Sequence, residues 1–123
     1  MTVVLLALAG GLGAIARFVV DGLLRAKVRT ALPWPTILIN ISGSALLGFL
    51  AGLVMRGAAP QSLQLVLGTG LMGGYTTFST ASLETVRLVQ SGRMGLALVN
   101  ALGSMIAGVL AAALGLGAAL MLP

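Results

Sequence analysis

Four long apolar runs dominate this sequence of 123 residues. They cover about residues 2–24, 32–55, 62–89 and 94–121. Each exceeds the ~20 residues that an α-helix needs to cross the hydrocarbon core of a bilayer. Only 7% of the residues are charged, against about 25% in an ordinary soluble domain. The sequence therefore predicts an all-α membrane protein whose single domain, residues 1–123, contains four transmembrane helices.

The residue types that are missing exclude several kinds of chemistry. The chain contains no cysteine and no histidine, which excludes disulfides, thiolate chemistry and the usual zinc ligands. Asp21 and Glu84 are the only acids, too few for a carboxylate cage around a divalent metal. There is no phosphate-binding Gly-x-x-x-x-Gly-Lys motif. We therefore expect no enzyme and no nucleotide-driven pump.

The net charge of +5 comes from basic residues at the ends of the apolar runs, so it does not indicate a nucleic-acid partner. With four spans, both termini and the middle loop share one side of the membrane, which carries only Arg56. The first and third loops carry five cations: Arg25, Lys27, Arg29, Arg87 and Arg93. By the positive-inside rule these two loops should be cytoplasmic.

The third apolar run is too long for one straight membrane helix. Its roughly 28 residues would span ~42 Å at ~1.5 Å per residue, whereas the hydrocarbon core is ~30 Å thick. Residues 68–80 are rich in glycine and hydroxyls. We predict a helix broken near the bilayer middle, where freed carbonyls and amides can hold ions. The alternative is a glycine-rich packing face whose hydroxyls bond to their own helix.

Several polar side chains fall inside the predicted spans. Asn40 lies in the middle of the second run, where its amide costs free energy unless it is hydrogen-bonded. It can donate to an anion or to a neighbouring helix. Asn100 and Ser104 are one turn apart and share a face of the fourth run. Such donors, without a fixed cation, suit a small anion that must lose its water shell and still leave.

Two further side chains have both a structural and a functional interpretation. Arg17 lies inside the first run and can pair with Asp21, reach toward the membrane surface, or form a positive vestibule that attracts anions. Phe78 most simply packs against other apolar groups. The positive edge of its ring can also touch an anion without donating a hydrogen bond.

Three segments, taken together, resemble the signatures of one family. They are residues 10–18 (GGLGAIARF), 35–43 (PTILINISG) and 70–84 (GLMGGYTTFSTASLE). In this order and at this spacing they resemble the first three helices of the Fluc (CrcB) fluoride channels. The resemblance covers nearly the whole chain. It implies a passive, fluoride-selective channel subunit of the bacterial inner membrane, which exports fluoride down its electrochemical gradient and so reduces fluoride toxicity.

The resemblance also implies an assembly and a set of functional residues. Two subunits would pair as an antiparallel, dual-topology-type dimer with two pores along the interface. A structural Na⁺ at the dimer centre would be held by the backbone carbonyls of Gly73 and Thr76 from each subunit. Arg17 would be the vestibule arginine. The fluoride pore would be lined by Asn40, Phe78, Ser79, Asn100 and Ser104.

The chain departs from the family pattern at positions that matter for conduction. Ala81 stands where the family usually has a second phenylalanine, and Asn100 stands where it often has tyrosine. Gly108 and Ala112 lack the hydroxyls that often follow Ser104. Half of the expected pore lining is therefore bare, and a pore built from these positions should conduct poorly or not at all.

Three alternatives to a simple homodimeric channel remain. Five cations on one side of the membrane against one on the other favour a single orientation of the chain. A fixed orientation in turn favours a heterodimer with a paralogous subunit of opposite charge bias, although a homodimer is also an open alternative. A non-conducting structural subunit fits the missing pore residues. A small multidrug-type exporter is disfavoured, because proton-coupled export of cations needs a membrane-buried carboxylate, which the first span lacks before Asp21.

Overall fold

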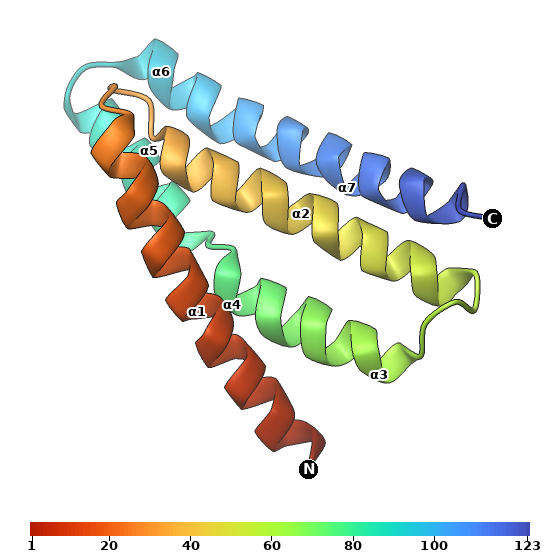
Figure 1. The fold of residues 1–123 in the computed structure, drawn as a ribbon. Coiled ribbons are helices and arrows are strands. Elements are labelled where there is room, and N and C mark those ends of the chain that lie inside the picture. Colours follow the sequence, from red (N-terminus) through yellow and green to blue (C-terminus); the bar gives the residue numbers. More distant parts are fainter.

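The computed structural model describes all 123 residues as helices joined by short connections (Figure 1). Helix α1 extends over Thr2–Lys27 and α2 over Trp34–Met55. Pro33 and Pro35 flank the start of α2, where a fixed φ and a missing amide hydrogen suit the first turn. Both helices, like the segment Met94–Leu120, are long and apolar enough to cross a membrane. The prediction of an all-helical chain with four helical segments is confirmed.

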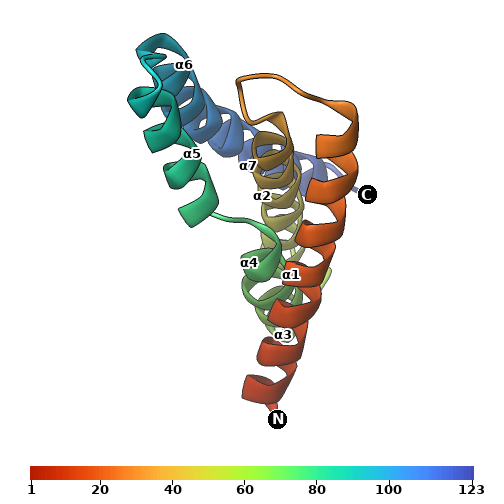
Figure 2. The ribbon, with the colours of Figure 1, turned by 90° about the vertical axis from the view of Figure 1, so that its left-hand side faces the viewer.

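The third segment consists of two helical pieces. Its first piece contains α3 (Gln61–Leu63), the π-helical η1 (Gln64–Met72) and α4 (Gly73–Tyr75). The chain becomes extended at Thr76, with φ −79° and ψ 158°, and helix resumes in α5 (Ser79–Gln90). Figure 2 shows α5 displaced sideways from the end of α4. The segment therefore changes direction halfway along its length.

The fourth segment begins after a tight turn at Gly92, whose φ of 81° favours glycine. It contains α6 (Met94–Leu98), the π-helical η2 (Val99–Gly103) and α7 (Ser104–Leu120). Figure 1 shows these pieces as one continuous rod beside α2. The π-helical stretches η1 and η2 have no counterpart in the sequence-based prediction.

Small residues bring the helices close together in two pairs. Between α2 and α7, a Cβ added to Gly48 would collide with the backbone of Ala112, and one added to Gly115 with the backbone of Ala45. Between α1 and α4, a Cβ on Gly74 would collide with the backbone of Gly10. Such close approaches favour van der Waals packing between helices in lipid, where a hydrophobic driving force is lacking.

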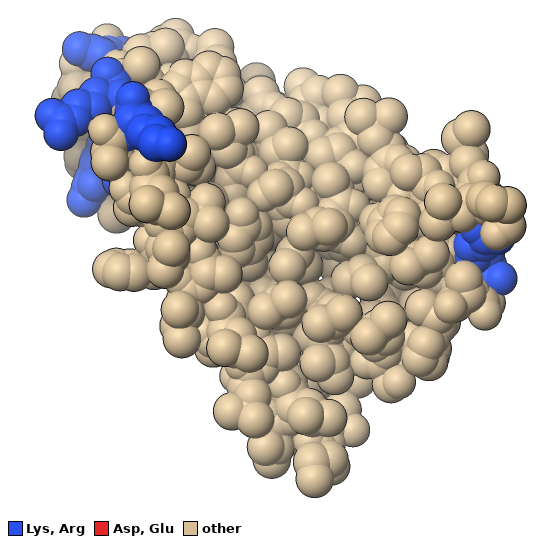
Figure 3. Space-filling view, viewed as in Figure 1, with Lys and Arg blue, Asp and Glu red and all other residues tan.

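The cationic side chains gather at opposite ends of the bundle, as the space-filling view shows (Figure 3). The larger group covers the end where α1 finishes and α5 turns into α6, and the smaller one lies near the connection between α2 and α3. There, Nη1 of Arg56 donates to the carbonyl of Ala119 at 2.9 Å, so the cation satisfies the carboxyl end of α7. The remaining surface is largely apolar, and Phe18 and Leu114 are 80% and 75% exposed.

Candidate functional site

The interruption of the third segment is held by Asn40 on α2. The side-chain Nδ2 of Asn40 donates to the carbonyl of Thr77, and the amide of Thr77 donates back to Oδ1 of Asn40, both at 2.8 Å. One side chain therefore satisfies both backbone groups of Thr77 at the point where the helix stops. Only one of the two Nδ2 hydrogens is needed for this pair, so the other is free to donate to a further acceptor.

This pairing changes what two carbonyls nearby can do. In a continuous α-helix the amide of Thr77 would donate to the carbonyl of Gly73, and the amide of Thr80 to that of Thr76. Here the Thr77 amide binds Asn40 instead, and the Thr80 amide donates to Oγ1 of Thr77 at 3.2 Å. Neither the Gly73 nor the Thr76 carbonyl accepts a hydrogen bond within the chain. These are the carbonyls that the resemblance assigns to sodium.

A cavity of about 220 Å³ lies beside the interruption, between α1, α2 and α5. Its polar lining combines three threonine hydroxyls with two charged side chains: Thr36, Thr77, Thr80, Arg17 and Asp21. Nε of Arg17 donates to the carbonyl of Gly74 at 3.3 Å, at the carboxyl end of α4. The guanidinium therefore faces the cavity while it is anchored to a helix terminus whose partial charge is negative.

The two acids of the chain are bound by a different arginine. Asp21 accepts from Nε of Arg25 at 3.0 and 2.9 Å, and Glu84 accepts from Nη2 of Arg25 at 3.3 Å. The hydroxyl of Thr36, which is only 2% exposed, donates to the other oxygen of Glu84. Of the alternatives for Arg17, pairing with Asp21 is therefore not what the structure shows. Both carboxylates lie at the basic end of the molecule, where they share Arg25 as their ion-pair partner.

Asn100 and Ser104 belong to a second polar group. Nδ2 of Asn100 donates to Oγ1 of Thr85 at 2.7 Å, and Oγ1 of Thr85 donates to the carbonyl of Ala81 at 2.9 Å. Oγ of Ser104 lies 3.5 Å from Oδ1 of Asn100. Asn100 is 2% exposed, so its side chain fastens η2 to α5 and is shielded from the outside of the chain.

Phe78 and Ser79 face away from the bundle. Phe78 is 88% exposed, and Ser79 is also exposed, with its hydroxyl 3.4 Å from that of Thr77. Gly73 is exposed as well, and a Cβ added there would meet nothing within 4 Å. The structure thus joins Asn40 and Ser79 through Thr77 and groups Asn100 with Ser104, but one chain encloses no path past Phe78.

Sequence reasoning missed Thr36 and Thr85, and it did not single out Thr77 and Thr80 from their neighbours. Thr77 and Thr80 belong to the hydroxyl-rich stretch that the sequence singled out, although nothing local tells which of its hydroxyls face inward. Thr36 stands in the first turn of α2, and its partner lies 48 residues further along the chain. Only the fold brings these groups together.

Comparison with known proteins places the chain in a family. The family model described as CrcB-like protein, Camphor Resistance (CrcB), matches residues 4–116. The chain belongs to the CrcB family. A relative from Leifsonia xyli subsp. xyli, named Fluoride-specific ion channel FluC 1, is 46% identical over 116 residues, which cover 94% of this chain and 85% of that protein.

Two further relatives of the CrcB chain bear related names. Fluoride-specific ion channel FluC from Novosphingobium aromaticivorans is 48% identical over 112 residues, covering 89% of each chain. Fluoride-specific ion channel FluC 2 from Cutibacterium acnes is 44% identical over 117 residues, covering 94% of this chain and 95% of that protein. Together with the three membrane-length apolar helices, the family makes this chain a multi-pass membrane protein and not an enzyme.

Proposed function

We propose that this chain is a subunit of a passive, fluoride-selective channel that lets fluoride leave the cytoplasm across a bacterial inner membrane. The observation that carries the proposal is the interrupted third segment, where Asn40 holds Thr77 beside a polar cavity. The choice of fluoride as the conducted ion rests on the relatives, which are named as fluoride-specific ion channels.

The interruption belongs near the middle of the membrane in this proposal. The third helical segment extends from Gln61 to Gln90, and residues 76–78 fall at its midpoint. Irregular backbone at such a depth is stable only if its polar groups are satisfied by protein or face a wet cavity. The pairing of Asn40 with Thr77 and the cavity lined by Thr80 supply both conditions.

A second subunit completes the pore. Phe78 and Ser79 lie on the outer surface of one chain, so they line an enclosed path only when another chain covers them. We propose an antiparallel dimer in which the exposed faces around Gly73 and Phe78 meet. The donors available to fluoride are then the free Nδ2 hydrogen of Asn40 and the hydroxyls of Ser79 and Ser104, and the ring edge of Phe78 adds a weakly positive contact.

The family implies a structural Na⁺ at the dimer centre, and the residues present fit it. The carbonyls of Gly73 and Thr76 have no partner within the chain, because the amides that would bind them are held by Asn40 and by Thr77. Carbonyl groups of unwound helix are typical ligands of Na⁺ in membrane proteins. When bound, the ion would supply a fixed positive charge and hold the two interruptions together. Each chain contributes two carbonyls.

Arg17 raises the local concentration of anions at the entrance to this path. Its guanidinium lines the cavity beside Thr77, and a positive group in a low-dielectric cleft attracts small anions. The hydrogen bond from Nε to Gly74 keeps the group in place and leaves the Nη hydrogens without a partner within the chain. Asp21 lines the same cavity, and its charge is partly offset by Arg25, which it shares with Glu84.

Transport is passive, and the gradient of fluoride sets its direction. Fluoride enters a cell as the neutral acid when the medium is acidic and dissociates in the more alkaline cytoplasm. A selective channel then lets the accumulated anion leave. The chain has no nucleotide-binding motif, and both of its acids are paired at the basic end, which leaves no free carboxylate within the membrane to exchange protons for a substrate.

We propose that the partner is a paralogous subunit with the opposite charge bias. Five basic residues lie at one end of this molecule and Arg56 at the other (Figure 3), which favours one orientation in the membrane. Ala81 leaves one pore without its second phenylalanine, so the partner would supply an intact pair. The second candidate, a non-conducting structural subunit of the same dimer, rests on this position.

Fluoride efflux from liposomes tests the proposal. The purified chain is reconstituted alone and together with a paralogue of opposite loop charge, and efflux is followed with a fluoride electrode. We expect fluoride efflux with the pair, little efflux of chloride, and slower efflux with this chain alone. Absence of fluoride efflux from both preparations would contradict the channel, and fast efflux from this chain alone would contradict the obligate heterodimer.

A further inference from the structure

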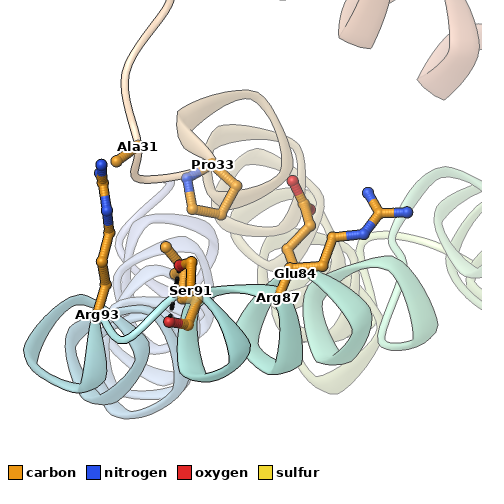
Figure 4. Close-up of a pocket in the computed structure, with 7 residues that line it drawn as sticks. Ala31, Pro33, Glu84, Arg87, Ser91 and Arg93 are labelled. Atoms are coloured by element: carbon orange, nitrogen blue, oxygen red, sulfur yellow. Dashed lines mark hydrogen bonds between the residues drawn. The ribbon is translucent and has the colours of Figure 1, made fainter.

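A second cavity, of about 360 Å³, lies at the basic end of the molecule. It is formed between the connection that precedes α2 and the last turns of α5. Pro33 lines it on one side, and Arg87, Ser91 and Arg93 line it on the other (Figure 4). In Figure 4 the side chain of Arg93 extends toward Ala31, while the guanidinium of Arg87 lies at the opposite end of the cavity. The two cations therefore flank one opening.

Neither of these arginines has an acidic partner. The salt bridges of the chain are those of Arg25 with Asp21 and with Glu84. Glu84 also lines the cavity, but its two oxygens are occupied by Thr36 and Arg25, and its side chain is only 11% exposed. Because Arg25 is shared between Asp21 and Glu84, Glu84 keeps part of its negative charge, and Arg87 and Arg93 leave the cavity with a net positive charge.

The position of the cavity indicates the depth at which it would lie in a membrane. Trp34 follows Pro33 directly, opens α2 and is 41% exposed. Tryptophan is enriched at the level of lipid headgroups, where basic residues also gather on the cytoplasmic side. The cavity is therefore expected to open at headgroup level, on the leaflet with which the positive end of the protein is in contact.

We propose that this cavity binds the phosphate of an anionic lipid headgroup. Guanidinium groups donate two parallel hydrogen bonds to phosphate oxygens, and basic pockets between membrane helices are suited to anionic headgroups. Ser91 lies between the two arginines, but its hydroxyl donates to the carbonyl of Leu88 at 3.0 Å, so the arginines supply the binding charge. This assignment does not depend on fluoride conduction.

Trp34 provides a reporter, because it is the only tryptophan in the chain. The full chain is reconstituted in phosphatidylcholine vesicles that contain a minor fraction of phosphatidylglycerol. Bromine atoms are placed near the headgroup end of the acyl chains, either on the phosphatidylglycerol or on an equal amount of phosphatidylcholine. Quenching of Trp34 fluorescence then measures how strongly each lipid accumulates beside the cavity.

Native protein should prefer phosphatidylglycerol to phosphatidylcholine by up to about 30-fold, the limit set by two basic groups near the headgroup. The double variant R87Q/R93Q should lose this preference. The matched control K27Q/R29Q removes two charges from the same end outside the cavity lining and should keep most of it. R87K/R93K keeps the charges without the two-pronged donors and should retain only part, which separates loss of binding from loss of folding.

Two results would overturn the assignment. If K27Q/R29Q loses as much preference as R87Q/R93Q, the attraction is a general effect of surface charge. Inorganic phosphate is also added at constant ionic strength. If it abolishes the preference for phosphatidylglycerol in both native protein and K27Q/R29Q, the cavity takes free phosphate rather than lipid. A preference that survives inorganic phosphate and disappears only in R87Q/R93Q supports the lipid site.

Discussion

Replacing Asn40 by leucine tests whether this side chain sets the geometry of the interruption. Leucine is branched at the same Cγ position, although it is bulkier, and makes neither of the two 2.8 Å hydrogen bonds to Thr77. At about 1 kcal/mol for each bond, the interrupted conformation loses ~2 kcal/mol. At about 1.4 kcal/mol per factor of ten, its population relative to a re-formed helix falls roughly 30-fold. The amide of Thr77 then becomes available to the carbonyl of Gly73.

The assay combines fluoride efflux with stabilisation by sodium. For Asn40→Leu we expect fluoride efflux to fall and the Na⁺ concentration that half-stabilises the protein against heat to rise, each by at most about 30-fold. K⁺ or a large organic cation serves as the reference. Ser42→Ala is the matched control on the same helix. Its hydroxyl bonds Ile39 and Tyr75 at 3.0 Å but does not touch the interruption. Its efflux and sodium dependence should be unchanged.

An unchanged sodium dependence in Asn40→Leu would refute the link between Asn40 and the carbonyls. Loss of efflux with unchanged sodium dependence would instead leave Asn40 as a donor to fluoride alone. Asn40→Asp separates the two roles further, because a carboxylate can accept from the Thr77 amide but cannot donate to the Thr77 carbonyl and places a negative charge beside an anion path. We expect it to abolish fluoride efflux.

Three further predictions concern other parts of the molecule. Gly115→Val should lower the yield of folded protein, measured by gel filtration, because its Cβ meets the backbone of Ala45, whereas Gly117→Val, where nothing lies within 4 Å, should not; equal yields would contradict this packing. Ala81→Phe should increase fluoride efflux from the chain reconstituted alone, and no increase would mean that this position is not what limits the pore. Phe78→Ala should reduce efflux without changing the melting temperature of the single chain, because the ring is 88% exposed there; a large loss of stability would assign it to packing.

Local patterns are enough to predict much of this fold. Apolar runs give the helices, the prolines before and within the start of α2 mark where it begins, and the glycines and hydroxyls near Thr77 mark where the third segment stops. These signals act within a few residues of one another. The close approach at Gly48 between α2 and α7 goes with a local signal of the same kind, two glycines four residues apart at positions 48 and 52.

Partners that are distant in sequence could not be predicted in this way. The amide of Asn40 binds a residue 37 positions away, and Glu84 binds a residue 48 positions away. Which group each side chain meets depends on the position of one helix along another, and a shift of one turn would exchange the partners. Arg17 and Arg25 are both four residues from Asp21 on α1, so spacing alone does not choose between them; distant contacts do, because Arg17 binds Gly74 and Arg25 also reaches Glu84.

The glycine contacts just before and at the interruption restrict how the molecule can move. Gly74 rests directly on Gly10, and Gly43 rests on Thr76, so the first half of the third segment has no room to swing past its neighbours. A carrier that works by rocking between inward- and outward-facing shapes needs that freedom. This architecture instead describes a fixed conduit, in which throughput depends on how quickly an ion sheds and regains its water.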